Sequence, residues 1–509
     1  MKKRIFSLIL AALFVLSALT AFASCSESKT NAEDEPAPTQ TTDLTAPSAE
    51  ADVPVDDETA ELLPDIPPLD FGGADFVVCT SGPNDDNGSD WITYDVYVEE
   101  LNGEVINDAV FERNLYLNET YNINFRAEVT NGNVHGSIQT DVKAGGGTYD
   151  AGFTGIMRGQ TLGAQGITHN MFTVPYVDLS KPWWDHRLTE DCTLLGDVYL
   201  ATGDITVIDN DATWILMFNK QMVIDLGLED IYTLVREDRW YYDTLYEMLQ
   251  TATRDTDGNG KLTPQVDTYG LVTTANTCYG LLYASGEQLA PKDADGIPTL
   301  VENIDRITSV VEKAGEILGN LDHVFVCDRT GYSTDNLRHI FEEGRSLFYG
   351  EVAQCIIRMR NSETDFGVIP WPKFDDTQKG FYNFVHNTAA KAIVIPVTEA
   401  DMEMCGAIVE AMAAKSKYTL TPAYYDTALT YKYMRDEESS EMMDIILESR
   451  CYDPAYINDW GGFAGQIHGV IYNGGTNLAS KWSSTSKAFN KMRDKAIDKL
   501  AEIQAERGG

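Results

Sequence analysis

Basic residues and histidines are scarce in this sequence. It has 38 Lys and Arg against 79 Asp and Glu, with seven His, and its formal net charge at pH 7 is −41. A field of that sign repels phosphate backbones and anionic head groups, which argues against nucleic acid and other polyanions as partners. The charge suits a soluble protein with neutral or cationic ligands, and solubility alone is the alternative explanation of it.

Closely spaced cysteines are also missing. The chain has eight cysteines, and the seven beyond Cys25 are dispersed, with no pair at zinc-ligand spacing. An odd, scattered set in a large exported chain does not resemble a disulfide framework. Most of these cysteines lie in apolar runs, so we interpret them as small core residues. They are Cys79, Cys192, Cys278, Cys327, Cys355, Cys405 and Cys451.

Recognisable catalytic motifs are lacking. The sequence has no G-x-S-x-G elbow, no H-E-x-x-H and no Walker loop, and its histidines show no metal-ligand spacing. Glycoside hydrolysis needs only two carboxylates, but nothing in the sequence singles out a pair. We therefore expect a protein that is not an enzyme, with an exported carbohydrate-active hydrolase as the alternative.

Only the N-terminus carries an apolar run with the features of a targeting signal. A basic start, Met1–Arg4, precedes apolar residues 5–22 and then Ala23-Ser24-Cys25. The run is short for a spanning helix, which needs about 20 residues. It resembles a bacterial lipoprotein signal, which implies a signal peptide over residues 1–24 and lipidation of Cys25. An ordinary secretory signal or an anchor helix is the alternative.

The next segment, residues 25–68, is rich in Ser, Thr, Ala, Pro, Glu and Asp. Such a composition cannot bury enough apolar surface to offset its ordering entropy, and its acidic charges extend it. We expect a disordered acidic tether. Together with the signal, it predicts a protein that is extracytoplasmic and lipid-anchored to the bacterial cell membrane.

The remaining chain alternates short apolar strands with helical spacing. Its length exceeds the size at which a single core stops growing, so two lobes are expected. Strands are predicted over 75–80 and 123–127, with a helix over 104–121 between them, and a further strand over 149–155. This order predicts a parallel α/β sheet. Ligands bind beyond the carboxyl ends of such strands, which marks the rim at 80–84 and 154–155.

Later segments continue the pattern. Apolar runs at 205–208 and 214–218 are separated by Asp209-Asn210-Asp211, and strands are predicted over 366–372 and 392–397. Thr398 and Asp401 stand at capping-box spacing before a helix. Cys405, Ile408, Val409 and Met412 give that helix a buried face. The segment 481–507 predicts a charged amphipathic helix.

Several stretches together resemble the extracellular solute-binding proteins of ABC importers, of the large sugar-binding type that includes maltose-binding protein. The resemblance covers roughly residues 69–509. It rests on the order and spacing of YDAGFTG (149–155), PWWDHRLTEDCTLLGDVYLATGDITVID (182–209), FNKQMVIDLGLEDIYTLVREDRW (218–240), FEEGRSLFYG (341–350), ETDFGVIPWPKFD (363–375), TPAYYD (421–426) and NDWGGF (458–463).

The resemblance implies a two-lobe periplasmic-binding-protein-like fold (type II) whose lobes close on a solute. It places an N-terminal lobe at 69–205 plus about 391–435, and a C-terminal lobe at about 206–390 plus 436–509. Gly203 and the turn 209–211 would then lie at the hinge. Plain surface loops are the alternative interpretation of these two features.

Sugars are held by aromatic faces and planar polar groups, and the chain has eight Trp and 25 Tyr. Trp183 and Trp184 are adjacent, so we expect that they cannot both face one core. Trp460 stands in a loop context, and Trp371 lies between two prolines. In the solute-binding proteins that the chain resembles, the segment that ends at Tyr349-Gly350-Glu351 places an aromatic residue in the ligand cleft. Core packing is the alternative for each aromatic residue. The candidate ligand-binding residues are Ser81, Thr154, Asp209, Tyr349, Glu351, Trp371 and Trp460.

The segment 255–263 resembles the start of a calcium-binding EF-hand loop. Ligands would come from Asp255, Asp257 and Asn259 and from the carbonyl of Lys261. The twelfth position is Val266, which cannot bind calcium, and Asp267 comes one place late. A distant acid completes such a loop in some sugar-binding proteins, and a surface loop rich in Asx turns is the alternative. No cofactor is required, and calcium would be structural.

These observations predict a lipid-anchored, extracellular, monomeric solute-binding protein. It would deliver a carbohydrate, specifically an oligosaccharide, to the permease subunits of an ABC-type importer. An exported hydrolase and a ligand-binding receptor that feeds a membrane sensor are the alternatives, and the sequence does not name the sugar.

Overall fold

The computed structural model describes residues 61–82, 91, 93–130, 133–319, 321–425 and 437–508, except the side chains of residues 360, 507 and 508. The predicted signal peptide, Cys25 and most of the predicted tether lie outside the described residues. So do residues 426–435 of the predicted N-terminal lobe. Glu61–Gly509 forms one compact unit. Among the described helices, none is both long enough and apolar enough to cross a membrane.

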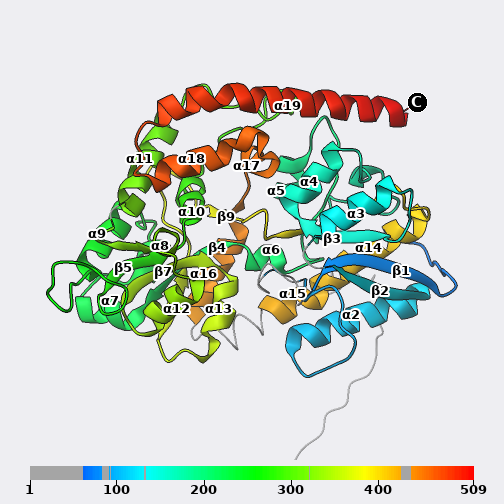
Figure 1. The fold of residues 1–509 in the computed structure, drawn as a ribbon. Coiled ribbons are helices and arrows are strands. Elements are labelled where there is room, and N and C mark those ends of the chain that lie inside the picture. The colour runs from blue at the N-terminus through cyan, green and yellow to red at the C-terminus, as the bar shows by residue number, and fades with distance from the viewer. Residues whose placement is uncertain are drawn as a thin grey trace, which may run out of the picture. The chain divides into compact units, whose positions relative to one another are not determined.

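A four-stranded sheet forms the centre of the first lobe (Figure 1). Its strands in spatial order are β10 (Lys391–Val394), β3 (Ala151–Gly155), β1 (Ala74–Ser81) and β2 (Ile123–Thr130). The first three strands along the chain are parallel, as predicted, with Ala74 opposite Ile123. The lobe also contains α2 (Val105–Tyr121), α3 (Val134–Lys143), α4 (Ile156–Ala164), η1 (Met171–Thr173), α5 (His186–Cys192) and α14 (Met402–Tyr418).

A five-stranded sheet forms the centre of the second lobe. Its order is β6 (Val324–Val326), β5 (Tyr269–Thr273), β7 (Ser346–Val352), β4 (Trp214–Asn219) and β8 (Phe366–Ile369). Its first group of helices is α7 (Lys220–Leu226), α8 (Ile231–Arg236), α9 (Tyr242–Ala252), α10 (Thr277–Ala284) and α11 (Asp305–Gly319). The next group is η2 (Cys327–Arg329), α12 (Thr334–Glu342), α13 (Gln354–Arg358), η3 (Met359–Asn361) and α16 (Glu437–Glu448).

Neither sheet is wholly parallel, which differs from the prediction. Strand β10 runs antiparallel to β3, and β4 runs antiparallel to both β7 and β8. Both exceptions are the strands that begin just after the chain has crossed from the other lobe. The crossing segment delivers the chain to the opposite end of the sheet, so the strand enters it in the reverse direction.

The chain crosses between the lobes near residues 204–213 and 385–390, and again beside β9 (Asn383–Phe384) and β11 (Arg450–Cys451), which pair in parallel. The predicted turn at 209–211 belongs to a short helix, α6 (Ile208–Asp211). Gly203 has φ +141°, and a Cβ there would lie 2.3 Å from the carbonyl oxygen of Trp183. The start of this crossing therefore requires glycine.

The two adjacent tryptophans Trp183 and Trp184 are both buried in the core of the first lobe. This overturns the expectation that they cannot face one core. Their indole Nε1 atoms donate to the two carboxylate oxygens of Glu410 on α14, at 3.1 and 3.0 Å. One buried carboxylate therefore satisfies both indoles.

Helix α14 begins at Met402, where the side chain of Asp401 accepts a hydrogen bond from the backbone N–H of Met404 at 3.0 Å. The cap is thus Asp401 rather than Thr398. The predicted buried face of α14 is confirmed, since Cys405, Ile408, Val409 and Met412 are at most 1% exposed. The seven cysteines from Cys79 to Cys451 are unpaired, and all except Cys451 are buried.

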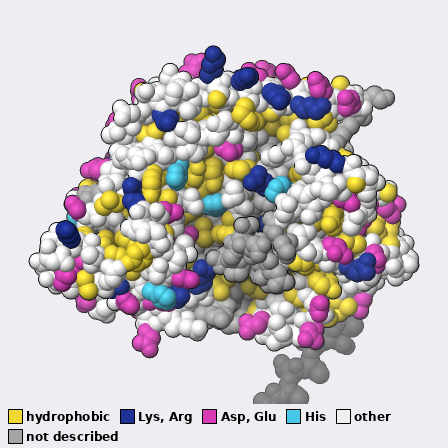
Figure 2. Space-filling view, viewed as in Figure 1, with side chains coloured by type: hydrophobic (Ala, Val, Ile, Leu, Met, Phe, Trp, Pro, Cys, Tyr) yellow, Lys and Arg dark blue, Asp and Glu magenta, His cyan; other side chains and the backbone are white. Residues whose placement is uncertain are grey.

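The last described segment is helical, as predicted. After β11 it comprises α17 (Pro454–Asn458), η5 (Trp460–Gly462), α18 (Phe463–Tyr472) and α19 (Leu478–Gly508), and a short helix α15 (Leu420–Pro422) follows α14 earlier in the chain. Helix α19 runs across the top of the view in Figure 1, above elements of both lobes. Lys and Arg side chains are spread along its outer face in Figure 2.

Candidate functional site

Two cavities lie between the lobes and share the lining residues Gln354 and Arg358. The larger has a volume of about 600 Å³ and the smaller about 180 Å³. In Figure 2, histidine side chains lie near the middle of the face in view, between the parts of the molecule that carry the two sheets. Because both lobes contribute walls, closure of the lobes would enclose a ligand held there.

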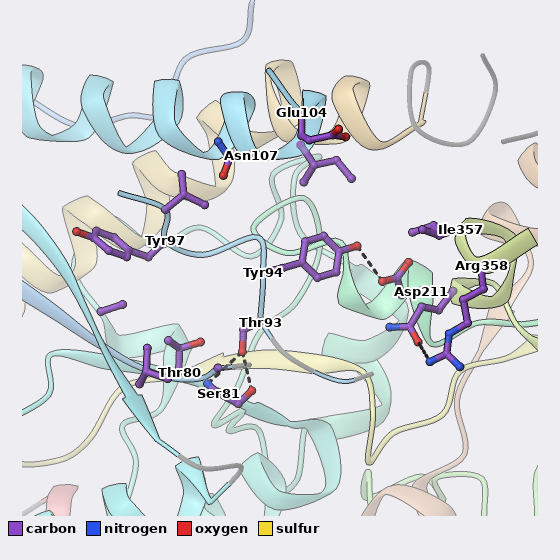
Figure 3. Close-up of a pocket in the computed structure, with 16 residues that line it drawn as sticks. Thr80, Ser81, Thr93, Tyr94, Tyr97, Glu104, Asn107, Asp211, Ile357 and Arg358 are labelled. Carbon is purple, nitrogen blue, oxygen red and sulfur yellow. Dashed lines mark hydrogen bonds between the residues drawn. The ribbon is translucent and has the colours of Figure 1, made fainter. Parts of the chain in front are cut away.

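The larger cavity has mainly first-lobe walls (Figure 3). Ser81 at the end of β1 and Ala127 and Val129 of β2 form its base, and Tyr94 and Tyr97 come from the segment after β1. Tyr97 is 37% exposed. The second lobe contributes Ile357 and Arg358 of α13, and Asp211 comes from the crossing. This wall offers aromatic faces beside hydroxyl groups.

Hydrogen bonds connect the segment 93–97, which carries Tyr94 and Tyr97, to β1 and to the crossing. Ser81 and Thr93 pair through their backbones at 3.0 Å and through their hydroxyl groups at 2.8 Å. The buried carboxylate of Asp95 accepts hydrogen bonds from the hydroxyl of Thr206 at 2.7 Å and the N–H of Val207 at 2.6 Å. The aromatic wall of the larger cavity is therefore positioned by the crossing.

Asp211 is the central acceptor of this arrangement. Its carboxylate, which is fully buried, accepts hydrogen bonds from the hydroxyl groups of Tyr94 at 2.8 Å and Tyr424 at 2.7 Å. Burial raises the pKa of Asp211 to about 7, and the two tyrosine hydrogen bonds oppose that rise. The residue that holds Tyr94 therefore titrates close to neutral pH.

The smaller cavity is built on the strand ends of the second lobe. Trp214 begins β4, Tyr349 and Glu351 lie near the end of β7, and Thr274 follows β5. Trp214 is 1% exposed and Thr274 is 8% exposed. Among the described residues, neither the indole Nε1 of Trp214 nor the hydroxyl of Thr274 has a hydrogen-bond partner. Unmade hydrogen bonds at buried atoms are costly, so a solute or water that satisfied them would be stabilised.

An aromatic cluster adjoins the smaller cavity through His386, which lines it. Tyr279 lies 4.6 Å, between ring centroids, from both Tyr456 and His468, and Phe384 lies 5.0 Å from Tyr456. Burial lowers the pKa of His386 to about 4, so its imidazole is neutral at pH 7. The cluster therefore presents uncharged rings rather than cations.

A third cavity, of about 410 Å³, lies at the crossing and is lined by charged groups. Arg450 on β11 donates to Asp209 at 2.8 Å and to Asp185 at 3.1 Å. The two carboxylates differ in their pKa shifts. Burial raises the pKa of Asp209 to about 7, whereas Arg450 and Arg187 outweigh burial at Asp185 and leave its pKa lowered. This ion-paired group joins one lobe to the crossing.

The structure places the predicted ligand residues in different surroundings. Ser81 lines the larger cavity, and Tyr349 and Glu351 line the smaller one. Asp209 lies at the crossing in its ion pair with Arg450. Thr154 is buried within β3.

The remaining two predicted residues are core residues in this structure. Trp371 is fully buried, and Trp460 is 6% exposed, with its ring 5.5 Å from that of Phe489 on α19. Both belong to the main hydrophobic cluster of the second lobe. Both positions agree with core packing, the alternative left open for each aromatic, although the indole Nε1 of Trp371 has no hydrogen-bond partner among the described residues.

Sequence reasoning missed Trp91, Tyr94, Tyr97 and Trp214, all of which line one of the two cavities. A signal was available for the first three. They follow the predicted rim at 80–84 within a short distance along the chain, in the pattern Trp91-Ile92-Thr93-Tyr94-Asp95-Val96-Tyr97. Trp214 gave no comparable signal because it opens an apolar strand.

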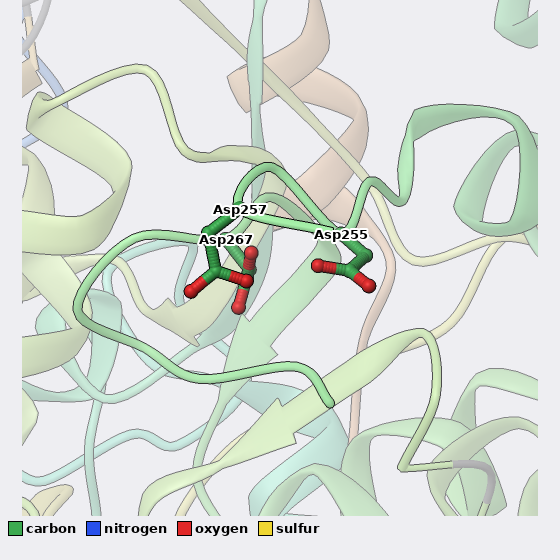
Figure 4. A group of neighbouring side chains, drawn as sticks. All are labelled: Asp255, Asp257 and Asp267. Atoms are coloured by element: carbon green, nitrogen blue, oxygen red, sulfur yellow. The ribbon is translucent and has the colours of Figure 1, made fainter. Parts of the chain in front are cut away.

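The predicted calcium loop brings three carboxylates together (Figure 4). One oxygen from each of Asp255, Asp257 and Asp267 lies within 4.8 Å of the others. Asp267 accepts hydrogen bonds from the backbone N–H groups of Thr256 and Thr263, both at 2.7 Å. The late acid therefore reaches the cluster, but the loop's own N–H groups already use its oxygens. Asn259 and Lys261 lie in the same turn, and calcium binding stays a prediction.

No family model matches the chain, and no curated protein matches it. Solved structures do resemble it. A sugar transporter protein of Rhizobium etli in an open conformation is 12% identical, with a TM-score of 0.55 over 82% of this chain and 99% of that chain. The maltose-binding periplasmic protein MalE from Listeria monocytogenes, in complex with maltose, is 14% identical, with a TM-score of 0.52 over 85% and 98%.

A third similar structure is an ABC substrate-binding protein from Listeria monocytogenes in complex with cycloalternan. It is 12% identical, with a TM-score of 0.51 over 86% of this chain and 99% of that chain. At these identities the likeness lies in the architecture. The predicted fold class is confirmed: the chain has the two-lobe α/β fold of these three proteins.

Proposed function

We propose that this chain is an extracellular solute-binding protein that delivers a carbohydrate, an oligosaccharide, to an ABC-type importer. The observation that carries the proposal is the pair of neighbouring cavities between the lobes, which share the lining residues Gln354 and Arg358. The larger cavity, at about 600 Å³, lies within the range of about 300–1,000 Å³ that is common for small-molecule sites. A second cavity that shares two of its lining residues suits a ligand of more than one ring.

The chemistry of the walls supports a carbohydrate. Tyr94, Tyr97 and Trp91 offer ring faces for the C–H surfaces of a sugar. The hydroxyl of Thr274 and the indole N–H of Trp214 offer hydrogen bonds for its hydroxyl groups. The neutral imidazole of His386 adds a polar group without a charge. Fold neighbours that hold maltose and cycloalternan support the same ligand class.

A thermal-shift screen of mono- and oligosaccharides tests the ligand class. A ligand at a hundredfold its dissociation constant stabilises the folded state by about 2.7 kcal/mol, which gives a clear rise in Tm. The same ligand should reduce the radius of gyration in small-angle scattering as the lobes close. Mass spectrometry of solute co-purified with native protein would identify the natural ligand.

Three outcomes would change the proposal. A response to peptides and none to sugars would keep the binding role and reject the carbohydrate. Steady catalytic turnover of a sugar would replace binding with hydrolysis. Solute uptake that is unchanged when this protein is absent would favour a receptor that feeds a membrane sensor.

Lipid anchoring at Cys25 is part of the same proposal. The cysteine follows small residues at the end of the apolar run, and it supplies the thiol to which lipid would be attached. Replacing it, Cys25→Ala, should abolish incorporation of a labelled lipid precursor and release the protein or leave it uncleaved. Continued labelling of the variant would reject the anchor. An extracytoplasmic, monomeric protein that contacts permease subunits follows from this proposal.

A further inference from the structure

Helix α19 makes contact with both lobes. Its 31 residues span about 46 Å at 1.5 Å per residue. Its first half packs on α18, which contacts α10 and α11 of the second lobe, and its second half reaches α4 of the first lobe. One continuous helix therefore bridges two bodies that must move relative to each other when a solute is enclosed.

The second-lobe end of α19 is held by aromatic packing. Trp482 meets Phe463 edge to face at 4.9 Å, and Phe489 packs on both Phe463 and Trp460, at 5.3 and 5.5 Å between ring centroids. Gly461 has φ +69°, and a Cβ there would lie 3.1 Å from the backbone nitrogen of Phe489. This close approach fixes the helix to the second lobe over its first three turns.

The first-lobe end of α19 is held by a smaller contact, which we call the brace contact. Leu500 is 1% exposed and belongs to the same hydrophobic cluster as Leu194 and Tyr199 of the first lobe. The side-chain Nε2 of Gln504 donates to the carbonyl oxygen of Leu195 at 3.1 Å. The brace contact therefore comprises Leu500 and Gln504 on one side and the segment Leu194–Tyr199 on the other.

Leu195 has an unusual backbone for its residue type. It stands in a tight turn closed by two hydrogen bonds between Leu194 and Asp197, at 2.8 and 3.0 Å, and its φ is +52°. Asn and Gly favour that conformation, whereas leucine is strained there. The Leu195 side chain packs against the cluster that contains Leu500. Packing at the brace contact thus offsets a local cost that an asparagine would avoid.

We propose that α19 is a brace between the lobes, and that its docking on the Leu194–Tyr199 turn sets the balance between open and closed arrangements. We expect relative motion of the lobes to be taken up at the first-lobe attachment, because the second-lobe attachment buries the two large aromatic side chains Trp482 and Phe489, whereas the first-lobe attachment buries Leu500. Loss of the brace contact should therefore change the interlobe distance in the protein without ligand, and the inference does not depend on which solute binds.

The test uses Leu500→Glu with a matched control, Ala501→Glu, which adds the same charge at an exposed neighbouring position. Hydrogen exchange in the last three turns of α19 and in residues 194–199 should quicken by about tenfold or more in Leu500→Glu alone. Spin labels introduced as non-canonical residues at Lys143 and Gln221, one in each lobe, should report a shifted or broadened distance distribution by pulsed EPR.

A milder variant guards against simple unfolding. Leu195→Asn relieves the strained backbone but removes the apolar packing, so the turn should gain local stability while the interlobe distance still changes. Gln504→Ala should also change the interlobe distance, with a smaller effect. Faster exchange with an unchanged distance distribution would overturn the proposal, because docking would then be only local. Unchanged exchange in Leu500→Glu would overturn it too, because the contact would then contribute nothing.

Discussion

The two walls of the cleft are built in different ways. The first-lobe wall carries Tyr94 and Tyr97 on an irregular segment after β1, and Tyr97 is 37% exposed. The second-lobe wall carries Trp214 and Tyr349 within strands of the sheet, and they are 1% and 2% exposed. The first wall is held by hydrogen bonds to buried carboxylates, and the second by core packing.

This difference separates recognition from stability. A side chain in a strand has many packing partners, so its position is fixed before a ligand arrives. An exposed ring on a loop can reorient around a ligand at little cost to the fold. We infer that the second-lobe wall supplies a preformed surface and the first-lobe wall supplies the adjustable one.

The largest expected effect is on the second-lobe wall. Trp214→Ala removes a buried indole from β4 and should lower the free energy of unfolding by about 3–5 kcal/mol. Urea denaturation followed by circular dichroism measures the change. A loss below about 1 kcal/mol would mean that this wall is not held by packing, and the comparison would fail at its more rigid side.

The first-lobe wall should respond in the opposite way. Tyr97→Ala should change the free energy of unfolding by less than about 1 kcal/mol, because the ring is exposed. It should nevertheless weaken binding of the oligosaccharide identified in the thermal screen by about tenfold, since aromatic anchors carry much of a binding energy. Calorimetric titration of the variant and the parent decides the matter. Equal affinities would leave Tyr97 outside the ligand site.

Most of the fold could be predicted from local patterns. The buried face of α14 at Cys405, Ile408, Val409 and Met412 follows from periodicity alone, which is a property of neighbouring residues. The direction of β4 and β10 could not be predicted in this way. It depends on which lobe the chain has just left, and no local pattern encodes that.

The candidate site was partly predictable for the same reason. Ser81 was found because the end of a strand can be recognised locally, whereas Tyr349 and Glu351 came from the family resemblance, and all three line the cavities. Trp460 was placed in a loop, yet its partner Phe489 lies on a helix 29 residues further along the chain, so its burial depends on tertiary contact. Trp183 and Trp184 share a core because Glu410, far away in sequence, accepts from both.

The carboxylate that holds the first-lobe wall should give this region a pH dependence. The folded-state pKa of Asp211 is raised to about 7, above an unfolded value of about 3.9. Its contribution to stability is therefore fully present below about pH 4 and is lost as the pH rises through 7. Asp211→Asn can still form hydrogen bonds with both tyrosine hydroxyls. It should reduce the slope of the unfolding free energy against pH by at most the amount that corresponds to about one bound proton.

The matched control for this pH dependence is Asp243→Asn, since the Asp243 side chain is 80% exposed. Denaturant unfolding of both variants and the parent between pH 5 and 8 gives the slopes. Asp209 and Glu410, whose pKa values are also raised to about 7 by burial, should leave part of the slope in the Asp211 variant. Identical slopes in all three proteins would contradict the role of Asp211.

The smallest expected effect concerns the loop behind the second-lobe wall. Residues 254 and 268 pair at its base, and the chain then enters β5, which Thr274 follows. If calcium binds among Asp255, Asp257 and Asp267, it stabilises the folded state by mass action and should raise Tm slightly, and a chelator should reverse the change.

Hydrogen exchange should slow in β5 and stay unchanged in β1, because the loop belongs to the second lobe. The double variant Asp255→Ala, Asp257→Ala should lose both responses. Superimposable melting curves of the parent with calcium and with chelator would identify the loop as a turn held by its own hydrogen bonds, and the second-lobe wall would then rest on core packing alone.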